Sequence, residues 1–485
     1  MARVLALDIG TSSIRATIYG ASLRPVRPGS QVRYRWRIGG DGGVEAAAAT
    51  LERGVAHAID RALDGGQSPI DAVAIAAFWH SLVGVDRHGR AVTSVVPWTD
   101  TRSSQESVAL RARLDERRVH ARTGCRIHPA YWPARIRWFA ERDAKTFRRV
   151  RRWQSFPAYL ESRWLGRDAE SRSQASATGF FIHEDNGWDA ELCDACGISP
   201  DHLGPIVDLD DESGRPSAAI ARRWPALARA RWIPAAGDGA LNNLGAGCRS
   251  TGDAALMIGT SGALRELWTA VKPPQVPFGL WRYWLDRRRV VVGGALSNGG
   301  NFVAWMRQTF ELDAGGRNAA RVDSAVARIA PDSHGLTVLP FLAGERSPDY
   351  PPDAFATIAG LRLATTPEQI FRAGLEGIAY RFREVLDELV DVVPVKRLTA
   401  TGTALTASRV WPQILADVLG CSVSVPRQAE LTSRGAAMIG FEQLGVNVPA
   451  AARPAVARVF HPDARANAIY RIAAERQRRL LRSLC

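Results

Sequence analysis

The chain has 485 residues, of which 46% are hydrophobic and 23% charged; this is the composition of a folded globular protein of several units and excludes a disordered or collagen-like chain. Basic residues outnumber acidic ones 63 to 49, which gives a net charge of +14, but only Lys145, Lys272 and Lys396 are lysines and the arginines are spread along the whole sequence. This spread indicates a bias in residue usage, because a nucleic-acid-binding tail would concentrate its charge in one block.

No segment of the sequence predicts export, a membrane span or a disulfide framework, and we expect a cytoplasmic protein. Residues 1–5 lead directly into a strand-like run without an apolar signal core, and no apolar stretch approaches the ~20 residues needed to cross a bilayer. Six cysteines are too sparse for a disulfide scaffold. Cys193 and Cys196 form one C-x-x-C pair, which we interpret as two unrelated thiols on a helix, with a redox or metal role as the alternative.

The first half of the chain alternates short apolar runs with longer helical patterns, which is typical of an α/β fold. Residues 3–8 (RVLALD) predict a buried strand and residues 13–19 its returning partner, joined by the turn Gly10-Thr11-Ser12. We then expect, in chain order, a helix over residues 44–65, a strand over 71–78, Arg-rich helices over 106–152 and a connector with one short helix over 197–230.

The second half opens on a near repeat of the first. Residues 6–12 read ALDIGTS and residues 255–261 read ALMIGTS, so six of the seven positions are identical. Each copy predicts a strand, a Gly-Thr-Ser turn and a second strand. We therefore predict a duplication into two domains, residues 1–248 and 249–450, followed by a basic helical extension over 451–485. Further expected elements are strands over 290–293, 336–342 and 397–401, and helices over 301–311, 367–390 and 408–419.

The two Gly-Thr-Ser turns are candidates for phosphate binding. Glycine lets a backbone approach an anion, and consecutive N–H groups and hydroxyls can hold phosphate oxygens; a plain hairpin turn is the alternative. Asp8 precedes the first turn and Met257 the second, so only the first copy offers a hard oxygen ligand for Mg²⁺. The sequence contains neither G-x-x-x-x-G-K-[ST] nor H-R-D, which excludes P-loop kinases and protein kinases.

Asp238 is a candidate general base. It lies between Gly237 and Gly239, at the end of a predicted strand near the middle of the chain, where it would face a cleft between the domains. Phosphoryl transfer to an alcohol needs a group that accepts the hydroxyl proton. An Asx-type turn is the alternative interpretation.

A third cluster contains aromatic and polar residues at the ends of predicted strands. Trp79, His80 and Ser81 follow one strand, and Trp98 and Asp100 follow later. Aromatic faces with a few polar groups are suited to holding a polyol, although a loop histidine is more often simply solvated.

Taken together, these segments resemble the FGGY carbohydrate kinases over residues 3–445. Residues 6–12 look like the first phosphate hairpin of that family and residues 258–262 like the second, and Asp238 falls where the family keeps its catalytic base. Further segments that resemble the family are 359–376 (its C-terminal signature), 401–404 with Ser408 and Trp411 (its adenosine loop) and 434–437. The resemblance implies an α/β protein of two actin-like ATPase (ribonuclease H-like) domains on either side of a cleft.

Within this family the chain most resembles the gluconokinases. The segments that carry this likeness are residues 80–82, 98–103, 237–241, 259–265 and 341–346. Five features depart from the pattern. Arg135 stands where the N-terminal signature has lysine, Trp132 stands where a small residue or proline is usual, and Gly374 departs from the residue type of the C-terminal signature. Thr403 replaces a usual glycine of the adenosine loop, and residues 347–352 differ from the aromatic-rich segment common in gluconokinases.

The resemblance implies ATP-dependent phosphorylation of a primary hydroxyl of a sugar or sugar acid, with gluconate converted to 6-phosphogluconate. A xylulokinase or another ketose or polyol kinase is the alternative within the family. A non-catalytic actin-like ATP-binding protein and a basic nucleic-acid binder are alternatives from other classes. We expect a small-molecule substrate and ATP as partners, no nucleic acid and no membrane, and a homodimer is compatible with the sequence.

The family pattern also implies roles for individual residues. ATP and Mg²⁺ are the expected cofactors, Asp8 is the expected metal ligand, and Asp238 is the expected catalytic base. The expected nucleotide contacts are Asp8, Gly10, Thr11, Ser12, Arg15, Gly259, Thr260, Gly300, Gly402 and Thr403. The expected substrate contacts are Trp79, His80, Trp98, Tyr131 and Asp238. A sugar acid would also need an arginine at its carboxylate, because the guanidinium fork suits that group, but the sequence does not indicate which arginine.

Overall fold

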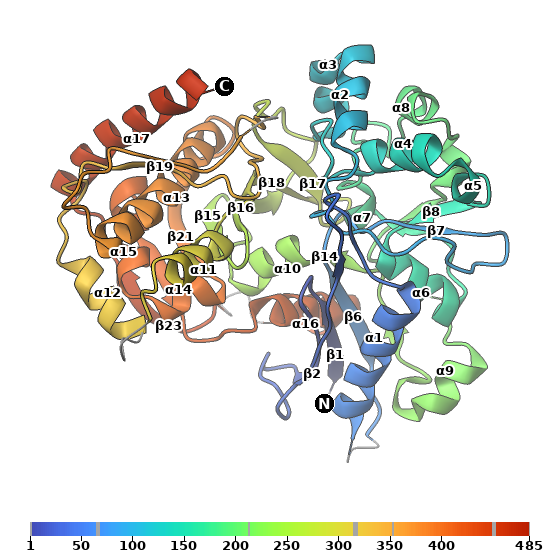
Figure 1. Cartoon of the computed structure of the whole chain (residues 1–485). Coiled ribbons are helices and arrows are strands. Elements are labelled where there is room, and N and C mark those ends of the chain that lie inside the picture. The colour runs from blue at the N-terminus through green and yellow to red at the C-terminus, as the bar shows by residue number, and fades with distance from the viewer. Residues whose placement is uncertain are drawn as a thin grey trace.

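Two β-sheets of related topology, one in each lobe of the molecule, organise the chain (Figure 1). The computed structural model describes residues 2–64, 68–211, 214–313, 319–351, 354–448 and 453–484. The lobe at the right of Figure 1 holds most of the first half of the chain, and the lobe at the left holds most of the second half. This arrangement confirms the predicted α/β class with two domains.

The sheet of the first lobe is built around the first predicted hairpin. β1 (Arg3–Ile9) pairs antiparallel with β2 (Ser13–Gly20), and β2 pairs antiparallel with β3 (Ser30–Arg33). On the other side of β1, β6 (Ala72–Ala77) runs parallel, followed by β13 (Arg231–Trp232) and β14 (Ala236–Gly237), which are both parallel to β6. Helices α1 (Ala48–Leu63) and α16 (Leu431–Gln443) cover opposite faces of this sheet, which explains why β1 and β6 are almost entirely apolar.

The sheet of the second lobe repeats this pattern. β16 (Gly262–Thr269) lies antiparallel between β15 (Gly252–Ile258) and β18 (Arg289–Leu296). β21 (Val395–Thr401) is parallel to β15, and β22 (Val423–Pro426) is parallel to β21. The orders β3-β2-β1-β6 and β18-β16-β15-β21 therefore agree in sequence and direction, which confirms the predicted duplication. β17 (Trp281–Trp284) and β23 (Val456–Phe460) extend the second sheet at its two edges.

Most predicted elements are present, and the differences have local causes. The helix expected over 44–65 begins at Ala48, because β5 (Val44–Glu45) pairs with β4 (Arg37–Ile38). The helical stretch over 106–152 is divided, because the side chains of Asp115 and Asp143 cap new helices. The strand expected over 336–342 is only β19 (Thr337–Leu339). The divided stretch consists of α2 (Ser104–Arg113), α3 (Glu116–Thr123), α4 (Trp132–Arg142) and α5 (Ala144–Phe147).

The remaining elements are short or cover the sheets. In the first half they are β7 (Val83–Val85), β8 (Arg152–Gln154), α6 (Phe156–Leu165), β9 (Glu170–Ser171), α7 (Arg172–Ala175), β10 (Phe181–Ile182), β11 (Gly187–Trp188), α8 (Ala190–Ala195), β12 (Ile206–Val207), α9 (Ala218–Arg223) and α10 (Asp238–Gly245), with 3-10 turns at Pro200–His202 and Pro225–Leu227. In the second half they are α11 (Gly300–Thr309), α12 (Ala319–Ala327), β20 (Thr357–Ala359), α13 (Pro367–Val390), α14 (Thr403–Ala407), α15 (Val410–Leu419) and α17 (Ala464–Leu484). Cys193 and Cys196 are buried free thiols at α8.

The helices α10 and α16 cross where the two halves of the chain meet. α16 comes from the second half in sequence, yet it packs on β1 and β6 of the first sheet and on α10. The crossing depends on two facing glycines, because a Cβ atom at Gly435 would overlap the carbonyl oxygen of Leu241 and one at Gly245 would overlap that of Leu431. The side chain of Arg434 donates to the carbonyl of Gly245 at 2.6 Å. This glycine crossing fixes α10, and with it the position of Asp238, relative to both lobes.

The C-terminal segment is integrated into the second lobe. The predicted boundary between residues 450 and 451 lies outside the described residues; beyond it, β23 pairs with β22 and α17 packs on α13 and α15. The buried carboxylate of Glu376 connects these helices. It accepts hydrogen bonds from Arg372 Nε at 2.6 Å and from Tyr470 Oη at 2.9 Å. His334 Nε2 lies 3.0 Å from the other oxygen of the same carboxylate. Burial opposes ionisation, but the bonds from His334 and Arg372 hold the pKa of Glu376 below its ordinary value.

Removing the hydroxyl of Tyr470 is expected to destabilise the second lobe. The Tyr470→Phe variant leaves Glu376 and Arg372 each one hydrogen bond short in a buried site, which costs about 1–2 kcal/mol of unfolding free energy. Denaturant unfolding followed by tryptophan fluorescence measures this cost. Ser483→Ala, on the exposed end of α17, is the control and should change stability by less than about 0.5 kcal/mol. If Tyr470→Phe is as stable as the parent protein, the hydrogen bonds between α17 and α13 do not stabilise the second lobe.

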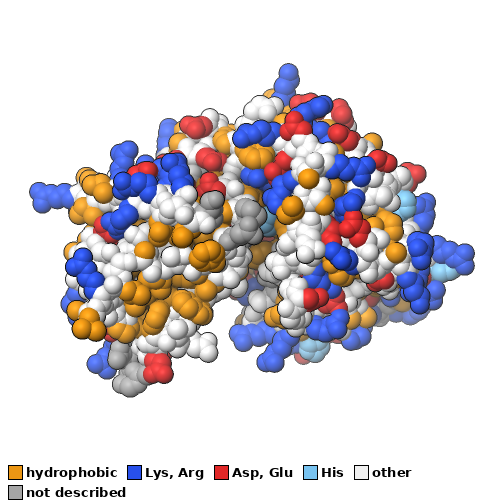
Figure 2. All heavy atoms as spheres, turned by 45° about the horizontal axis from the view of Figure 1, so that its top comes forward, with side chains coloured by type: hydrophobic (Ala, Val, Ile, Leu, Met, Phe, Trp, Pro, Cys, Tyr) orange, Lys and Arg blue, Asp and Glu red, His pale blue; other side chains and the backbone are white. Residues whose placement is uncertain are grey.

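Basic side chains lie both on the surface and in the interior of the structure. On the face shown in Figure 2, lysines and arginines are interspersed with acidic side chains over both lobes. Arg135, Arg282 and Arg381 are among the largest fully buried side chains. Within the described part of the chain, no helix combines the length and apolar character that a membrane span requires. The positive charge therefore includes arginines that stabilise the interior.

Candidate active site

The surface is hollowed between the two lobes (Figure 2), and a cavity of about 280 Å³ is lined by residues of both. The predicted site residues that line it are Asp8, Gly10, Thr11, Ser12, Arg15, Trp79, His80, Trp98, Tyr131, Asp238, Gly259 and Thr260. The structure thus brings together segments that are up to 250 residues apart. We call the part formed by residues 10–12 and 259–261 the hairpin end, and the part formed by Trp79, His80, Trp98 and Tyr131 the aromatic end.

At the hairpin end, the carbonyl oxygens of both turns are bound by other groups. The carbonyls of Gly10 and Thr11 accept hydrogen bonds from Tyr34 Oη at 2.5 Å and Trp36 Nε1 at 2.6 Å. In the second turn, the carbonyls of Gly259 and Thr260 accept from the first backbone N–H groups of α11 at 2.9 and 3.0 Å. The amides of Gly10 and Gly259 close the turns by donating to the carbonyls of Ser13 and Ser261, both at 3.0 Å. The hydroxyls and the remaining amides of the turns are therefore the groups that can face an anion.

Three predicted nucleotide contacts lie behind the second turn and do not line the cavity. Gly300 is the first residue of α11, and its N–H is the donor to Gly259. Gly402 has a φ of 90° and caps α14, where its Cα packs directly against the backbone of Ile258. Thr403 is the first residue of α14, and its side chain lies outside the described part of the structure. Gly300 and Gly402 therefore support the turn from the second lobe.

Asp8 and Arg15 occupy paired positions on β1 and β2, next to the first turn. Arg15 Nη1 lies 3.4 Å from Asp8 Oδ2, and Arg15 Nε lies 3.3 Å from Glu430 Oε2. Burial raises the pKa of Asp8 to about 7; Arg15 opposes this rise, and the charge of Asp238 adds to it. Two carboxylates therefore face the same cavity. In the second copy the matching pair is Met257 and Ala263, so the asymmetry seen in the sequence is retained.

Asp238 is the first residue of α10. Its Oδ1 accepts a hydrogen bond from the backbone N–H of Gly239 at 2.7 Å. Burial raises the pKa of Asp238 to about 6, and this rise is opposed by the nearby guanidinium of Arg265 and by the Gly239 N–H. A carboxyl group with this pKa is ionised at neutral pH and still basic enough to take a proton.

His80 is held as a neutral acceptor at the aromatic end. Its backbone has a φ of 67°, and its Nδ1 lies 2.6 Å from the carbonyl oxygen of Ala177. A carbonyl only accepts, so Nδ1 carries the proton and Nε2 keeps its lone pair. Burial lowers the pKa of His80 to about 3, which keeps the ring neutral.

Arg135, the residue that departs from the family signature, supports this end from behind. It is fully buried, and its guanidinium donates to the carbonyl oxygens of His80 at 2.5 Å, Pro129 at 2.8 Å and Ala130. Arg135 therefore fixes the strained backbone of His80 and the segment that leads to Tyr131. It positions the residues of the aromatic end without lining the cavity.

Two further aromatic residues of this end come from the second half of the chain. Trp281 and Tyr283 lie on the same face of β17 with their rings stacked at 4.2 Å. Tyr283 Oη is 2.7 Å from Tyr131 Oη, and the Tyr283 ring meets that of Trp79 edge-on at 5.0 Å. The sequence analysis missed both. The alternation in Trp281-Arg282-Tyr283-Trp284 places the two rings on one face but does not indicate which cavity that face lines.

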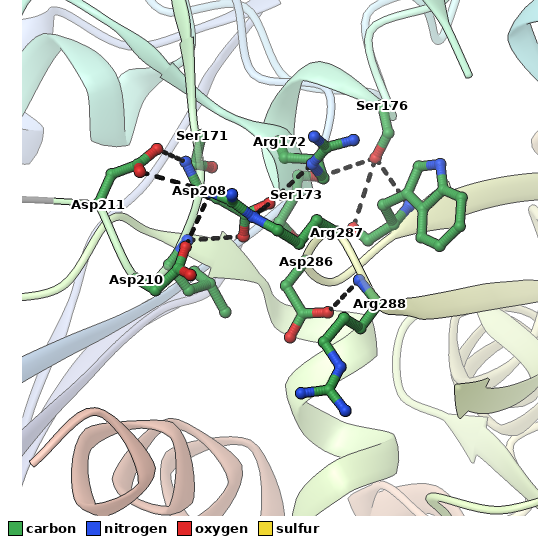
Figure 3. Close-up of polar contacts among 12 residues, drawn as sticks. Ser171, Arg172, Ser173, Ser176, Asp208, Asp210, Asp211, Asp286, Arg287 and Arg288 are labelled. Atoms are coloured by element: carbon green, nitrogen blue, oxygen red, sulfur yellow. Dashed lines mark hydrogen bonds and ion pairs between the residues drawn. The ribbon is translucent and has the colours of Figure 1, made fainter. Parts of the chain in front are cut away.

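The turn between β17 and β18 is anchored to the first lobe by the polar contacts in Figure 3. Arg287 reaches Asp210 at 2.9 Å and Asp208 at 3.4 Å, and Asp208 is also bound by Arg172 at 2.7 Å. The backbone N–H of Trp284 donates to Ser176 Oγ at 2.9 Å. β17 thus belongs to the second sheet by its pairing while being attached to the first lobe.

Two other residues that the sequence analysis did not single out are arginines that line the cavity. Arg346 donates to the carbonyl of Leu296 at 3.1 Å, and its guanidinium stacks on Trp98 at 4.5 Å. Arg265, on β16, is only 4% exposed, and its Nε and Nη2 have no hydrogen-bond partner among the described residues. Neither forms an ion pair with an acidic side chain in the described part of the chain. Positive charge is therefore available in the cavity.

Two α/β domains of repeated topology around one cavity define a two-domain protein of the actin-like ATPase fold. More specifically, the chain belongs to the FGGY family of carbohydrate kinases: the family's N-terminal domain matches residues 3–245 and its C-terminal domain matches residues 254–444. The protein is therefore a carbohydrate kinase that acts on a small-molecule substrate, with ATP as co-substrate.

Individual relatives differ in their substrates. The chain is 29% identical over 454 residues to a gluconokinase of Bacillus subtilis, covering 91% of this chain and 88% of that one. It is also 29% identical over 369 residues to a xylulose kinase of Streptomyces rubiginosus, covering 76% and 73% of the two chains. The solved structure of a gluconate kinase from Lactobacillus acidophilus superposes with a TM-score of 0.91 at 21% identity, covering 100% of this chain and 98% of that one.

Proposed function

We propose that the protein transfers the γ-phosphoryl group of ATP to the primary hydroxyl of gluconate, giving 6-phosphogluconate. The observation that carries this proposal is the position of Asp238, a carboxylate with a raised pKa in a cavity lined by two phosphate-type turns and a cluster of aromatic side chains. The likeness to gluconokinases over nine-tenths of the chain supports gluconate as the acceptor.

In this mechanism, Asp238 accepts the proton of the primary hydroxyl while the hydroxyl oxygen attacks the γ-phosphorus in line. The bond from phosphorus to the β–γ bridging oxygen breaks, and ADP leaves. The turns at the hairpin end bind the phosphates, supported by Gly300, Gly402 and Thr403. At the aromatic end, Trp79, Trp98 and Tyr131 bind the carbon chain, and His80 Nε2 accepts a hydrogen bond from a substrate hydroxyl. Approach of the lobes excludes water and limits hydrolysis of ATP.

The hairpin end also fits magnesium. Asp8 is a buried carboxylate whose pKa is raised by burial and by the charge of Asp238, so a divalent cation would lower the cost of two nearby negative charges. We propose Asp8 as its protein ligand. Bound there, magnesium supplies neutralisation of the ATP phosphates.

We also propose domain boundaries and a cellular location for the enzyme. We assign residues 1–248 to the domain that carries the first turn and the base, residues 249–450 to the domain that carries the second turn, and residues 451–485 to a C-terminal extension. We place the enzyme in the cytoplasm, where ATP and phosphorylated sugars are found.

The substrate is tested by ADP release with gluconate, xylulose, ribulose, fuculose, erythritol and glycerol at matched concentrations. We expect gluconate to have the highest kcat/KM. A preference for xylulose or ribulose would contradict the proposal and support the ketose kinase alternative. ATP hydrolysis that none of these acceptors stimulates would instead favour a non-catalytic ATP-binding protein.

The pH dependence of kcat/KM is expected to show the ionisation of Asp238. The base must be deprotonated, so at saturating ATP and magnesium, which keep Asp8 ionised, kcat/KM for gluconate should be constant above pH 7 and fall tenfold per unit once the pH is well below about 6, the pKa of Asp238. Circular dichroism at each pH serves as the control for unfolding. A profile that stays flat down to pH 4.5 with intact structure would rule out a base with this pKa.

A further inference from the structure

Arg265 carries a buried charge that forms no ion pair with an acidic side chain of the described residues, although the charge of Asp238 acts on it. It is 4% exposed, and burial lowers its pKa only to about 10, so the guanidinium stays protonated at neutral pH. Its Nε and Nη2 have no hydrogen-bond partner among the described residues. A buried guanidinium whose N–H groups lack partners destabilises the folded protein, and an anion that binds it removes this penalty.

The other arginines of the cavity already have partners. Arg15 is bound by Asp8 and Glu430, and Arg346 is bound by the Leu296 carbonyl and stacks on Trp98. Of the three arginines that line the cavity, Arg265 alone has a side chain with no hydrogen bond to the described residues. It is therefore the guanidinium best placed to form new bonds with a ligand.

The backbone next to the base leaves room for this guanidinium. A Cβ atom at Gly239 would lie 2.5 Å from Arg265 Nη1 and would also overlap the ring of Trp79. Any larger residue after Asp238 would therefore displace Arg265 or Trp79. No ion pair joins Arg265 to Asp238 in the described structure, although their charges interact.

The strand geometry places Arg265 toward the aromatic end. The second turn ends at Ser261, and Arg265 follows four residues later on β16, about 13 Å along a strand that rises about 3.3 Å per residue. Its neighbours across the sheet are Gly293 on β18 and then Trp281 on β17. The anion that Arg265 binds is therefore expected to belong to the acceptor substrate and not to the phosphates of ATP.

We infer that Arg265 is the specificity-determining residue that binds the carboxylate of the acceptor, so that the enzyme selects sugar acids over the corresponding sugars and alcohols. This inference rests on the proposed function, because it assigns an anion to the substrate of the same site. It also identifies the arginine that the sequence analysis expected at the carboxylate.

The test compares gluconate with glucitol, which has a hydroxymethyl group in place of the carboxylate. Trp79, Trp98 and Trp281 line the cavity, so tryptophan fluorescence can report binding of either ligand without ATP. In Arg265→Met, we expect the Kd for gluconate to rise about 100-fold, because a charge-assisted pair is lost, while the Kd for glucitol changes less than about threefold. The preference for the acid should therefore disappear.

Arg346→Met is the matched comparison, since it removes a second arginine from the same cavity. Arg346 stacks on Trp98, and this contact does not depend on the charge of the substrate. We therefore expect Arg346→Met to raise the Kd for gluconate and the Kd for glucitol by the same factor. The inference is overturned if Arg265→Met keeps the preference for gluconate, or if Arg346→Met is the variant that loses it. It is also overturned if Arg265→Met lowers kcat with an unchanged Kd for gluconate, because Arg265 would then act on the phosphoryl group.

The parent protein separates this inference from the proposed function. If the parent enzyme phosphorylates another sugar acid in preference to gluconate, gluconate is the wrong substrate, and the acid–alcohol comparison is repeated with that acid. If the parent enzyme prefers a neutral ketose, the proposed function fails irrespective of the variants. If it phosphorylates gluconate and Arg265→Met binds gluconate unchanged, only the inference fails.

Discussion

Asp238→Asn is expected to reduce kcat about 10³–10⁴-fold while leaving the affinity for ATP unchanged. The amide has the shape of the carboxylate, and its oxygen can still accept the hydrogen bond from the Gly239 N–H, but it cannot take the hydroxyl proton. ADP release with saturating gluconate measures kcat, and calorimetric titration with ATP measures binding.

Asp194→Asn is the matched control, because Asp194 is an exposed carboxylate on α8 and should leave kcat unchanged. Full activity of Asp238→Asn would show that another group accepts the proton. Loss of ATP binding in Asp238→Asn would show that the carboxylate organises the hairpin end and is not primarily a base.

Gly435→Ala is expected to lower kcat about 100-fold and to reduce the unfolding free energy by about 3 kcal/mol. The added methyl group would overlap the Leu241 carbonyl, so α16 and α10 must move apart. Since Asp238 is the first residue of α10, this movement shifts the base relative to the substrate, and a displacement near 1 Å can cost about two orders of magnitude. Gly245→Ala, on the opposite helix, should have the same effect.

Gly40→Ala is the control for both glycine variants, because a Cβ atom at Gly40 has no neighbour within 4 Å. Thermal unfolding and ADP release are measured on all three proteins. If Gly435→Ala is destabilised but retains full kcat, the crossing stabilises the fold without setting the position of Asp238. If it is as stable and active as Gly40→Ala, close contact of the helices is not required.

The parts of the fold that follow from local sequence were predicted well. The two Gly-Thr-Ser hairpins form from neighbouring residues, so their repeat was sufficient to predict a duplication, and the helix over 367–390 agrees with α13 at both ends. The placement of α16 against the first sheet could not be predicted. It depends on contact between segments about 350 to 440 residues apart, and the amino acids of α16 are apolar or small on several faces.

The same division applies to the candidate site. Residues in turns, such as Gly10, Asp238 and Gly259, were recognisable because an unusual local pattern surrounds them. Residues on the walls, such as Trp281 and Arg265, were not, because strand alternation indicates which side chains share a face but not what that face meets. The sequence alone offered no means of choosing one among 63 basic residues. In the structure, Arg265 is distinguished because it lines the cavity and its side chain forms no hydrogen bond with the described residues.

The attachment of β17 has a consequence for how such enzymes can diverge or be recombined. Its pairing places Trp281 and Tyr283 in the second sheet, while the contacts of Arg287 fasten the strand to the first lobe. The cavity is therefore lined by residues from both halves of the chain. A chimera that joins the first half of one carbohydrate kinase to the second half of another is expected to have a hybrid acceptor pocket, and a specificity transplant is expected to need Arg265 and residues 281–289 together with the N-terminal half.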